Sequence, residues 1–129
     1  MSKIEKFEGV VAWQKVRDLT QEIYARAKAG PFAKDFGLKD QIQRASVSIM
    51  GNVAGGFDRG GDKEFIQFLS ISKGSCGEVK SHLYVALDQQ YINATQFSGL
   101  YTSAVEMGRL LAGFMAHLKQ SDLRGRKFK

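Results

Sequence analysis

The 129-residue sequence contains one cysteine, one proline and two histidines, and it has no long apolar run. A single cysteine excludes a disulfide within the chain, and one cysteine with two histidines is too few for a zinc-type ligand set. No segment approaches the roughly 20 apolar residues of a membrane-spanning helix. The start of the chain lacks the apolar run of a signal sequence. We therefore expect a cytoplasmic protein without a membrane segment, a metal or another cofactor.

The composition is that of an ordinary folded protein, with 43% hydrophobic and 25% charged residues. Length and composition together predict a single domain over residues 1–129. The net charge is +6, but residues 31–92 carry seven charges of each sign, whereas residues 93–129 carry six basic and two acidic residues. The basic C-terminal tail, residues 119–129, suits a polyanion, and it is equally the kind of charged end that only keeps a chain soluble.

Apolar residues recur at alternating steps of three and four in four stretches of the chain. This spacing keeps one face of a helix against neighbouring helices. It predicts helices over about residues 11–29, 37–57, 63–90 and 94–120. The four stripes are Trp13, Val16, Thr20, Ile23 and Ala27; Leu38, Ile42, Ala45, Ile49, Asn52 and Gly56; Phe65, Leu69, Ser72, Cys76, Val79, Leu83 and Ala86; and Phe97, Leu100, Ala104, Met107, Leu111, Phe114 and Leu118.

The connections between the predicted helices are short and carry residues that end or start helices. Gly30-Pro31 ends the first helix, since proline disfavours a helical residue before it. Asp62 is the expected N-cap of the third helix, and Asn93 with Gln96 resembles a capping box at the start of the fourth. Short connections place consecutive helices antiparallel, so the sequence predicts an all-α, up-down-up-down four-helix bundle.

The antiparallel arrangement also predicts which stripe positions face each other. Ile49 is expected opposite Ser72, and Gly56 opposite Phe65. Small residues thus meet large ones, as close packing requires.

Asn52 is the most informative polar position, because the pattern places it on the inner stripe in the layer of Trp13. A buried amide is destabilising unless it is hydrogen-bonded, and the indole of Trp13 also needs a partner. We expect the two to form a structural pair in the core rather than a binding site.

Two features favour assembly of several copies. Gly74 and Gly77 lie in the middle of the third helix, where each glycine is unfavourable by roughly 1 kcal/mol relative to alanine, which suggests close approach of another backbone, within the bundle or from another subunit. Apolar residues outside the stripes, such as Val47 and Ile71, form either a wide core or a subunit interface. We expect a homo-oligomer.

The residues that most often carry catalysis do not form a recognisable set. Cys76 lies on an inner stripe and is expected to be a buried, unreactive thiol. His82 and His117 lie on different helices without ligating partners, and surface positions are expected for both. Residues 55–63 are rich in glycine, but they lack the Gly-Lys-Ser/Thr ending of a phosphate-binding loop. We therefore predict that the protein is not an enzyme.

Several segments resemble a known bacterial family. Residues 36–49 read FGLKDQIQRASVSI, residues 52–59 NVAGGFDR, residues 64–75 EFIQFLSISKGS, and residues 11–15 VAWQK. These motifs resemble the four-helix-bundle proteins first noticed as reading frames in intervening sequences of bacterial 23S ribosomal RNA genes. The resemblance covers Phe7 to about Leu118. The chain departs from the family at Gly55, where glutamate is usual, and near Met50, where proline is common.

The resemblance implies a fold and a kind of partner more than a chemical activity. It implies a bundle that assembles as a ring-shaped homopentamer. It also implies kinship with accessory proteins of diversity-generating retroelements, which are basic, bind nucleic acid and partner a reverse transcriptase. No catalytic activity comes with the family.

We accordingly predict a non-enzymatic homo-oligomer that binds RNA or DNA, structured RNA or ribosomal RNA above all, through phosphate contacts of low sequence specificity. The sequence shows no aromatic-rich platform for stacking bases. The alternative is a scaffold for another protein, such as an accessory subunit of a reverse transcriptase. The candidate phosphate contacts are Arg17, Arg26, Arg109, Lys119, Arg124, Arg126, Lys127 and Lys129.

Overall fold

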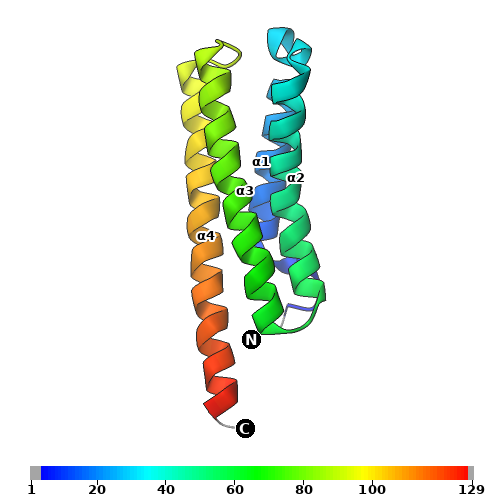
Figure 1. Cartoon of the computed structure of the whole chain (residues 1–129), viewed down its shortest axis with the longest axis vertical. Helices are drawn as coiled ribbons and strands as arrows, with labels where there is room; N and C mark the ends of the chain where they lie inside the picture. The colour runs from blue at the N-terminus through cyan, green and yellow to red at the C-terminus, as the bar shows by residue number, and fades with distance from the viewer. Residues whose placement is uncertain (1–3, 128–129) are drawn as a thin grey trace.

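The computed structural model describes the backbone of residues 4–127 and the side chains of residues 4–121. All regular structure in this part of the chain is helical. The four long helices are α1 (Val11–Ala27), α2 (Phe36–Asp58), α3 (Asp62–Asp88) and α4 (Ala94–Lys127), and two short 3-10 helices are η1 (Phe7–Gly9) and η2 (Gly30–Lys34). Figure 1 shows consecutive long helices running antiparallel. The predicted four-helix bundle is therefore confirmed.

The four helices surround one core. Helix α2 packs on α1 and α3, and α4 packs on α3 and on α1, which closes the bundle. Helix α4 is the longest and continues past the turn between α2 and α3 (Figure 1). Its helical backbone reaches Lys127, beyond the predicted end near Gln120, because no glycine pair or proline interrupts the sequence there.

The connection between α1 and α2 ends one helix and also contributes to the core. Helix α1 stops at Ala27, Gly30 has a φ of 57°, and Pro31 lies at the start of η2. A positive φ is readily adopted by glycine, which explains why the chain turns at this residue. Phe32 of η2 is buried and stacks on Tyr91 with ring centroids 5.2 Å apart. The sequence predicted the break but not this buried ring.

Asp35 joins the start of α2 to the connection between α3 and α4. One carboxylate oxygen accepts a hydrogen bond from the backbone N–H of Leu38 at 3.1 Å, which caps α2. The other accepts a hydrogen bond from the hydroxyl of Tyr91 at 2.9 Å. This bond to a carboxylate raises the pKa of the Tyr91 hydroxyl.

One of the two predicted caps is confirmed and the other is wrong. The N–H of Asn93 donates to the side-chain oxygen of Gln96 at 2.9 Å, and the N–H of Gln96 donates to that of Asn93 at 2.8 Å, so the capping box is present. Asp62 is not the N-cap of α3, because Gly61 holds that position and Asp62 is the first helical residue. A carboxylate there still interacts favourably with the positive end of the helix dipole.

The predicted register between α2 and α3 is confirmed by two contacts. The hydroxyl of Ser72 donates to the carbonyl of Ile49 at 3.0 Å in the buried interior. A Cβ built on Gly56 would lie 2.9 Å from Cδ1 of Phe65 and 2.6 Å from Cβ of Phe68. Only glycine fits between these rings, so the small-against-large pairing holds.

The prediction for Asn52 is wrong. Asn52 is half-buried, and its amide donates within α2 to the carbonyl of Ser48 at 2.9 Å and to the hydroxyl of Ser48 at 3.1 Å. Val53 takes the inner position, fully buried. The stripe after Ile49 advances by four residues instead of three, and the apolar side chain is the one that leaves water. Trp13, also half-buried, meets Phe7 edge-on at 5.1 Å instead.

Among the described residues, Gly74 and Gly77 have no close neighbour outside the backbone of their own helix. Both are exposed, and a Cβ on either would meet nothing within 4 Å. Close approach of a backbone within the bundle is therefore excluded as the reason for these glycines.

Candidate nucleic-acid interface

The predicted cationic contacts fall into two groups by what the structure describes. Arg17 and Arg26 lie on α1, Arg109 and Lys119 lie on α4, and all four are exposed. Arg124, Arg126 and Lys127 belong to the last turns of α4, where the backbone alone is described. Lys129 lies outside the described residues.

The antiparallel fold gathers part of this set at one end of the bundle. Arg17 follows the start of α1, and Lys119 precedes the end of α4, so both lie toward the end where α4 projects past the α2–α3 turn (Figure 1). Residues 124, 126 and 127 continue along the projecting part of α4. We call this region the basic end. Arg26 lies near the opposite end of α1, so the structure does not join it to this group.

Arg17 is held against an aromatic side chain. Its guanidinium carbon lies 5.9 Å from the centre of the Trp13 ring. This cation–π contact stabilises the position of a side chain that remains exposed. Arg17 is therefore partly ordered and still accessible to a phosphate.

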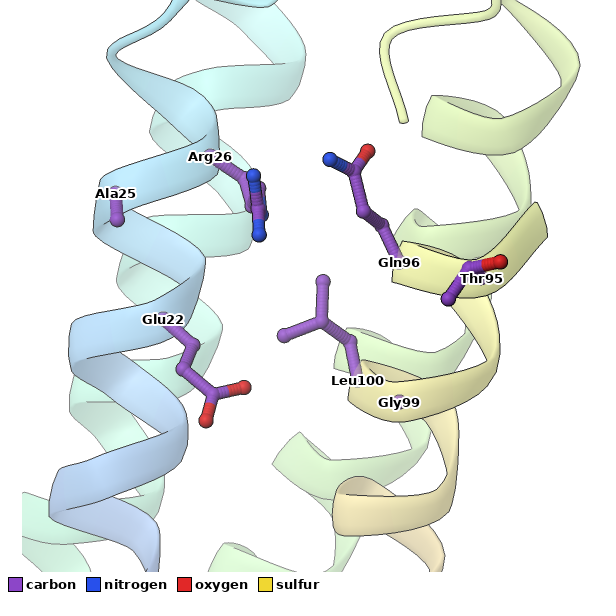
Figure 2. A pocket seen from close by; sticks show the side chains of 7 residues that line it. All are labelled: Glu22, Ala25, Arg26, Thr95, Gln96, Gly99 and Leu100. Atoms are coloured by element: carbon purple, nitrogen blue, oxygen red, sulfur yellow. The ribbon is translucent and has the colours of Figure 1, made fainter. Parts of the chain in front are cut away.

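Arg26 lies in a groove between α1 and α4. The groove has a volume of about 310 Å³ and is lined by Glu22, Ala25, Arg26, Thr95, Gln96, Gly99 and Leu100. Figure 2 shows Arg26 and Gln96 reaching toward each other from opposite helices, with the carboxylate of Glu22 below them. A phosphate at Arg26 would therefore approach a carboxylate.

A second hollow continues along the same two helices. It has a volume of about 130 Å³ and is lined by Lys15, Asp18, Leu19, Glu22, Ser103, Glu106 and Met107. Carboxylates outnumber cations along the combined groove, since three acidic residues accompany two basic ones. The local charge disfavours a polyanion here, despite the basic chain as a whole.

A third groove, between α2 and α3, gathers the polar side chains of the central motifs. It has a volume of about 260 Å³ and is lined by Gln41, Arg44, Ala45, Ser48, Ser75, Glu78 and His82. His82 is half-buried there, so the prediction of a surface histidine is only partly right, whereas His117 is exposed as predicted.

The hydrogen bonds in this third groove are structural. The hydroxyl of Ser75 donates to the hydroxyl of Ser48 at 3.1 Å, and the guanidinium of Arg44 pairs with Asp40 at 2.9 Å. A serine nucleophile is activated by donating its proton to a base, and Ser75 donates to another hydroxyl. The Ser75–Ser48 bond joins α3 to α2, whereas the Arg44–Asp40 pair lies within α2.

Cys76 is buried as predicted, at 1% exposure. Burial raises the pKa of its thiol to about 11, and the nearby Lys80 ammonium lowers it by a smaller amount. The thiol is protonated at neutral pH and is a weak nucleophile.

The structure brings together an aromatic group that the sequence analysis missed. Tyr84 of α3 lies 4.9 Å from Phe97 and 5.5 Å from Tyr101 of α4, and the last two rings stack at 5.2 Å, all between ring centroids. We call these three residues the aromatic patch. From the sequence we expected no aromatic-rich platform for stacking bases and did not anticipate this group of three rings. The signal was present in the sequence. Leu83 of the third stripe faces Leu100 of the fourth in the antiparallel hairpin, so the residues that follow them, Tyr84 and Tyr101, lie side by side.

Two further searches of the described residues bear on the kind of site. No group of three or more histidine, cysteine, aspartate or glutamate side chains there is placed to hold a metal ion. None of the described helices is both long and apolar enough to cross a membrane.

Comparison with known proteins identifies relatives of the whole bundle. Residues 8–113 match the family model described as 23S rRNA-intervening sequence protein. A crystal structure of a protein of unknown function from the S23 ribosomal protein family of Bacteroides thetaiotaomicron VPI-5482 superimposes with a TM-score of 0.74 at 22% sequence identity. The alignment covers 81% of this chain and 98% of that one. The comparison with curated proteins gives no match.

Proposed function

The chain belongs to the 23S rRNA-intervening sequence protein family, and from this premise we propose that it is a non-enzymatic, homo-oligomeric protein of the cytoplasm that binds structured RNA. The contacts are made to phosphates at the basic end and have low sequence specificity. Arg17 and Lys119 contribute, together with the basic positions of the α4 extension, whereas Arg109 lies near the middle of α4 and contributes less. Arg26 contributes least, because carboxylates share its groove.

The observation that carries the proposal is the projection of α4 from the bundle. Arg124, Arg126 and Lys127 lie on a helical segment beyond the α2–α3 turn (Figure 1). The projecting segment carries several cations and one acidic residue, Asp122, and this excess of positive charge attracts the phosphates of an RNA. Each phosphate neutralised releases counterions, so affinity is expected to fall steeply with salt.

Assembly would multiply the effect of one basic end. The exposed Gly74 has no close neighbour outside its own helix among the described residues, and close approach of a second copy would explain a glycine there. Several basic ends held in one ring would bind one RNA with far higher affinity than a single copy. This reasoning favours an oligomer, with a pentamer as the expected size.

A protein scaffold is the second candidate function. Phe36 is 76% exposed and Ile71 is 55% exposed, and exposed apolar side chains of this size often lie at interfaces. They would contact a partner such as a polymerase subunit. Burial of both residues between copies of this chain would remove this reason for proposing a different protein partner.

The test is RNA binding across a salt series, with the oligomer mass followed by light scattering. The full chain is compared with a variant carrying Arg124→Gln, Arg126→Gln and Lys127→Gln. A matched control removes three cations at the other end, with Lys28→Gln, Lys34→Gln and Lys39→Gln. We expect the first variant to weaken binding by about 10-fold or more and to reduce the salt slope, while the control changes little.

Two results would overturn the proposal. If the intact oligomer binds no RNA at low salt, the protein-scaffold function is the better explanation. If both variants weaken binding equally, general charge and not the basic end is responsible.

A further inference from the structure

The aromatic patch lies on the surface, on the side of the bundle formed by α3 and α4. Tyr84 is 49% exposed, and Phe97 and Tyr101 are half-buried beside it. Interaction with the hydroxyl of Tyr101 raises the pKa of the Tyr84 hydroxyl, so Tyr84 is neutral at physiological pH. Three rings within 5.5 Å of each other, partly open to solvent, form a ready surface for another planar group.

The charge around the patch is mixed, with basic residues in excess. After its first turn, α3 carries two acidic residues: Glu78, which lines the groove toward α2, and Asp88, which is exposed and lies one turn beyond Tyr84. Between residues 94 and 121, the acidic residue of α4 is Glu106, which lines the groove toward α1. Glu78 and Glu106 therefore lie away from the α3–α4 side, whereas Asp88 borders the patch.

Two lysines occupy this side of α3. Lys73 and Lys80 are separated from Tyr84 by eleven and four residues, a spacing that places all three on one face of a helix. The influence of Lys80 on the pKa of Cys76 places its ammonium on the flank of α3, close to the core. The patch is thus bordered by the two lysines and by one carboxylate, that of Asp88.

Two glycines, which carry no side chain, lie on the surface near the cations and the rings. Gly77 lies between the two lysines on the same face of α3, and Gly108 of α4 follows Tyr101 by seven residues. A Cβ on either glycine would meet nothing within 4 Å. The backbone of an extended ligand could therefore lie close to both helices.

We propose that the aromatic patch stacks unpaired bases of single-stranded RNA, while Lys73 and Lys80 bind the adjoining phosphates. Stacking on exposed rings beside cations is how many proteins bind single strands without reading their sequence. The inference rests on the proposed function, because it takes RNA as the ligand and adds a second contact surface. Unpaired loops would bind the patch, whereas paired segments would bind the basic end.

The first test compares a single-stranded RNA of about 12 nucleotides with a duplex of the same length, at one salt concentration. The variants are Tyr84→Ser, Tyr84→Phe and a matched control, Tyr24→Ser, which removes a tyrosine of 40% exposure from α1. We expect Tyr84→Ser to weaken single-strand binding about 10-fold and to leave duplex binding unchanged. Tyr84→Phe keeps the ring and is expected to bind as the natural chain does, and so is Tyr24→Ser.

The second test separates charge from stacking. The double variant Lys73→Gln, Lys80→Gln should reduce the slope of single-strand affinity against salt by about 1.4, whereas Tyr84→Ser should leave that slope unchanged. Circular dichroism of every variant confirms that a loss of binding is not a loss of folding.

The outcomes distinguish the two proposals. If the natural chain binds neither RNA, the proposed function fails and this inference fails with it. If it binds RNA but Tyr84→Ser binds the single strand equally well, this inference alone is overturned. A change in oligomer mass with Tyr84→Ser, without a specific loss of single-strand binding, would assign the patch to an interface between copies and would also overturn it.

Discussion

The interface between α2 and α3 differs in kind from the interface between α1 and α4. At the first, small side chains let the helices approach, and the hydroxyl of Ser72 reaches the backbone of Ile49 through the core. At the second, Glu22 and Arg26 project between the helices and leave hollows of about 310 and 130 Å³. Both pairs are antiparallel, so direction does not explain the difference.

The size and charge of the side chains explain it. Gly56 allows Phe65 and Phe68 to lie directly against α2, which brings the two backbones together. Long charged side chains keep their ends in water, and water must reach the space between the helices for them to do so. The bundle thus has one interface that is closely packed at its centre, although a hollow of about 260 Å³ opens at its surface, and one interface whose hollows are lined by charged side chains.

The largest expected effect tests this difference with two leucines. Leu69 of α3 is fully buried, whereas Leu100 of α4 is also buried but lines the open groove. We expect Leu69→Ala to lower the free energy of unfolding by about 4 kcal/mol and Leu100→Ala by about 2 kcal/mol, because a cavity beside a groove can fill with water. Urea unfolding followed by circular dichroism measures both. Equal losses would mean that the groove is closed in solution.

The pH dependence of the free energy of unfolding reports how far water is excluded from the interior around α3. The pKa of Cys76 is raised from 9.0 to about 11 by burial. Below pH 9 the thiol is protonated in both the folded and the unfolded chain. Between pH 9 and 11 the unfolded chain loses this proton and the folded chain keeps it, so stability falls as pH rises, by about 2 kcal/mol in total.

Urea unfolding at pH 8.5 and pH 11, on the natural chain and on Cys76→Ala, checks this prediction. Tyr84 and Tyr91 also have raised pKa values and destabilise the fold at high pH in the same direction, so the Cys76→Ala variant supplies the background to subtract. An identical pH dependence in the two chains would show that water reaches the thiol.

Two adjacent glycines test the close approach of α2 and α3. A methyl group on Gly56 would lie 2.6 Å from Cβ of Phe68, whereas one on Gly55 would lie 3.7 Å from the Phe68 ring, an ordinary contact. We expect Gly56→Ala to destabilise the fold by about 2 kcal/mol through overpacking, even though alanine favours a helix. We expect Gly55→Ala to stabilise it by about 0.5 kcal/mol. The measurement is the urea midpoint of each variant, and a stable Gly56→Ala protein would contradict the packing described.

The sequence was most informative where apolar periodicity was unambiguous. The stripe positions of α3, from Phe65 to Ala86, are all buried. Near the end of α2, the next inner position after Ile49 is Asn52 if the step is three residues and Val53 if it is four, and the periodicity allowed either. Burial of Val53 is favoured by hydrophobic transfer, which the pattern of steps does not contain.

The candidate site was harder to predict, because it depends on pairs that the chain separates. The charge of Arg26 was visible in the sequence. The carboxylate of Glu106 comes to line the same groove between α1 and α4 only because α4 folds back on α1. Tyr84 and Tyr101 likewise become neighbours through the α3–α4 hairpin. Phe32, in a connection expected only to break a helix, is buried because Tyr91 comes from a second connection at the same end of the bundle.

The smallest predicted effect concerns the hydrogen bond that crosses the tight interface. Ser72→Ala removes the donor to the Ile49 carbonyl and is expected to lower the free energy of unfolding by about 1 kcal/mol, since that carbonyl keeps its place in the helix of α2. Ser70→Ala, at an exposed position on the same helix, is the matched control and should not destabilise the fold. Because Ser72 ties two helices, its loss should also speed amide exchange along the neighbouring turns of α2, which Ser70→Ala leaves unchanged. If the two variants are equally stable and exchange equally, close packing alone holds α2 against α3, and the hydroxyl only satisfies its own need for a partner.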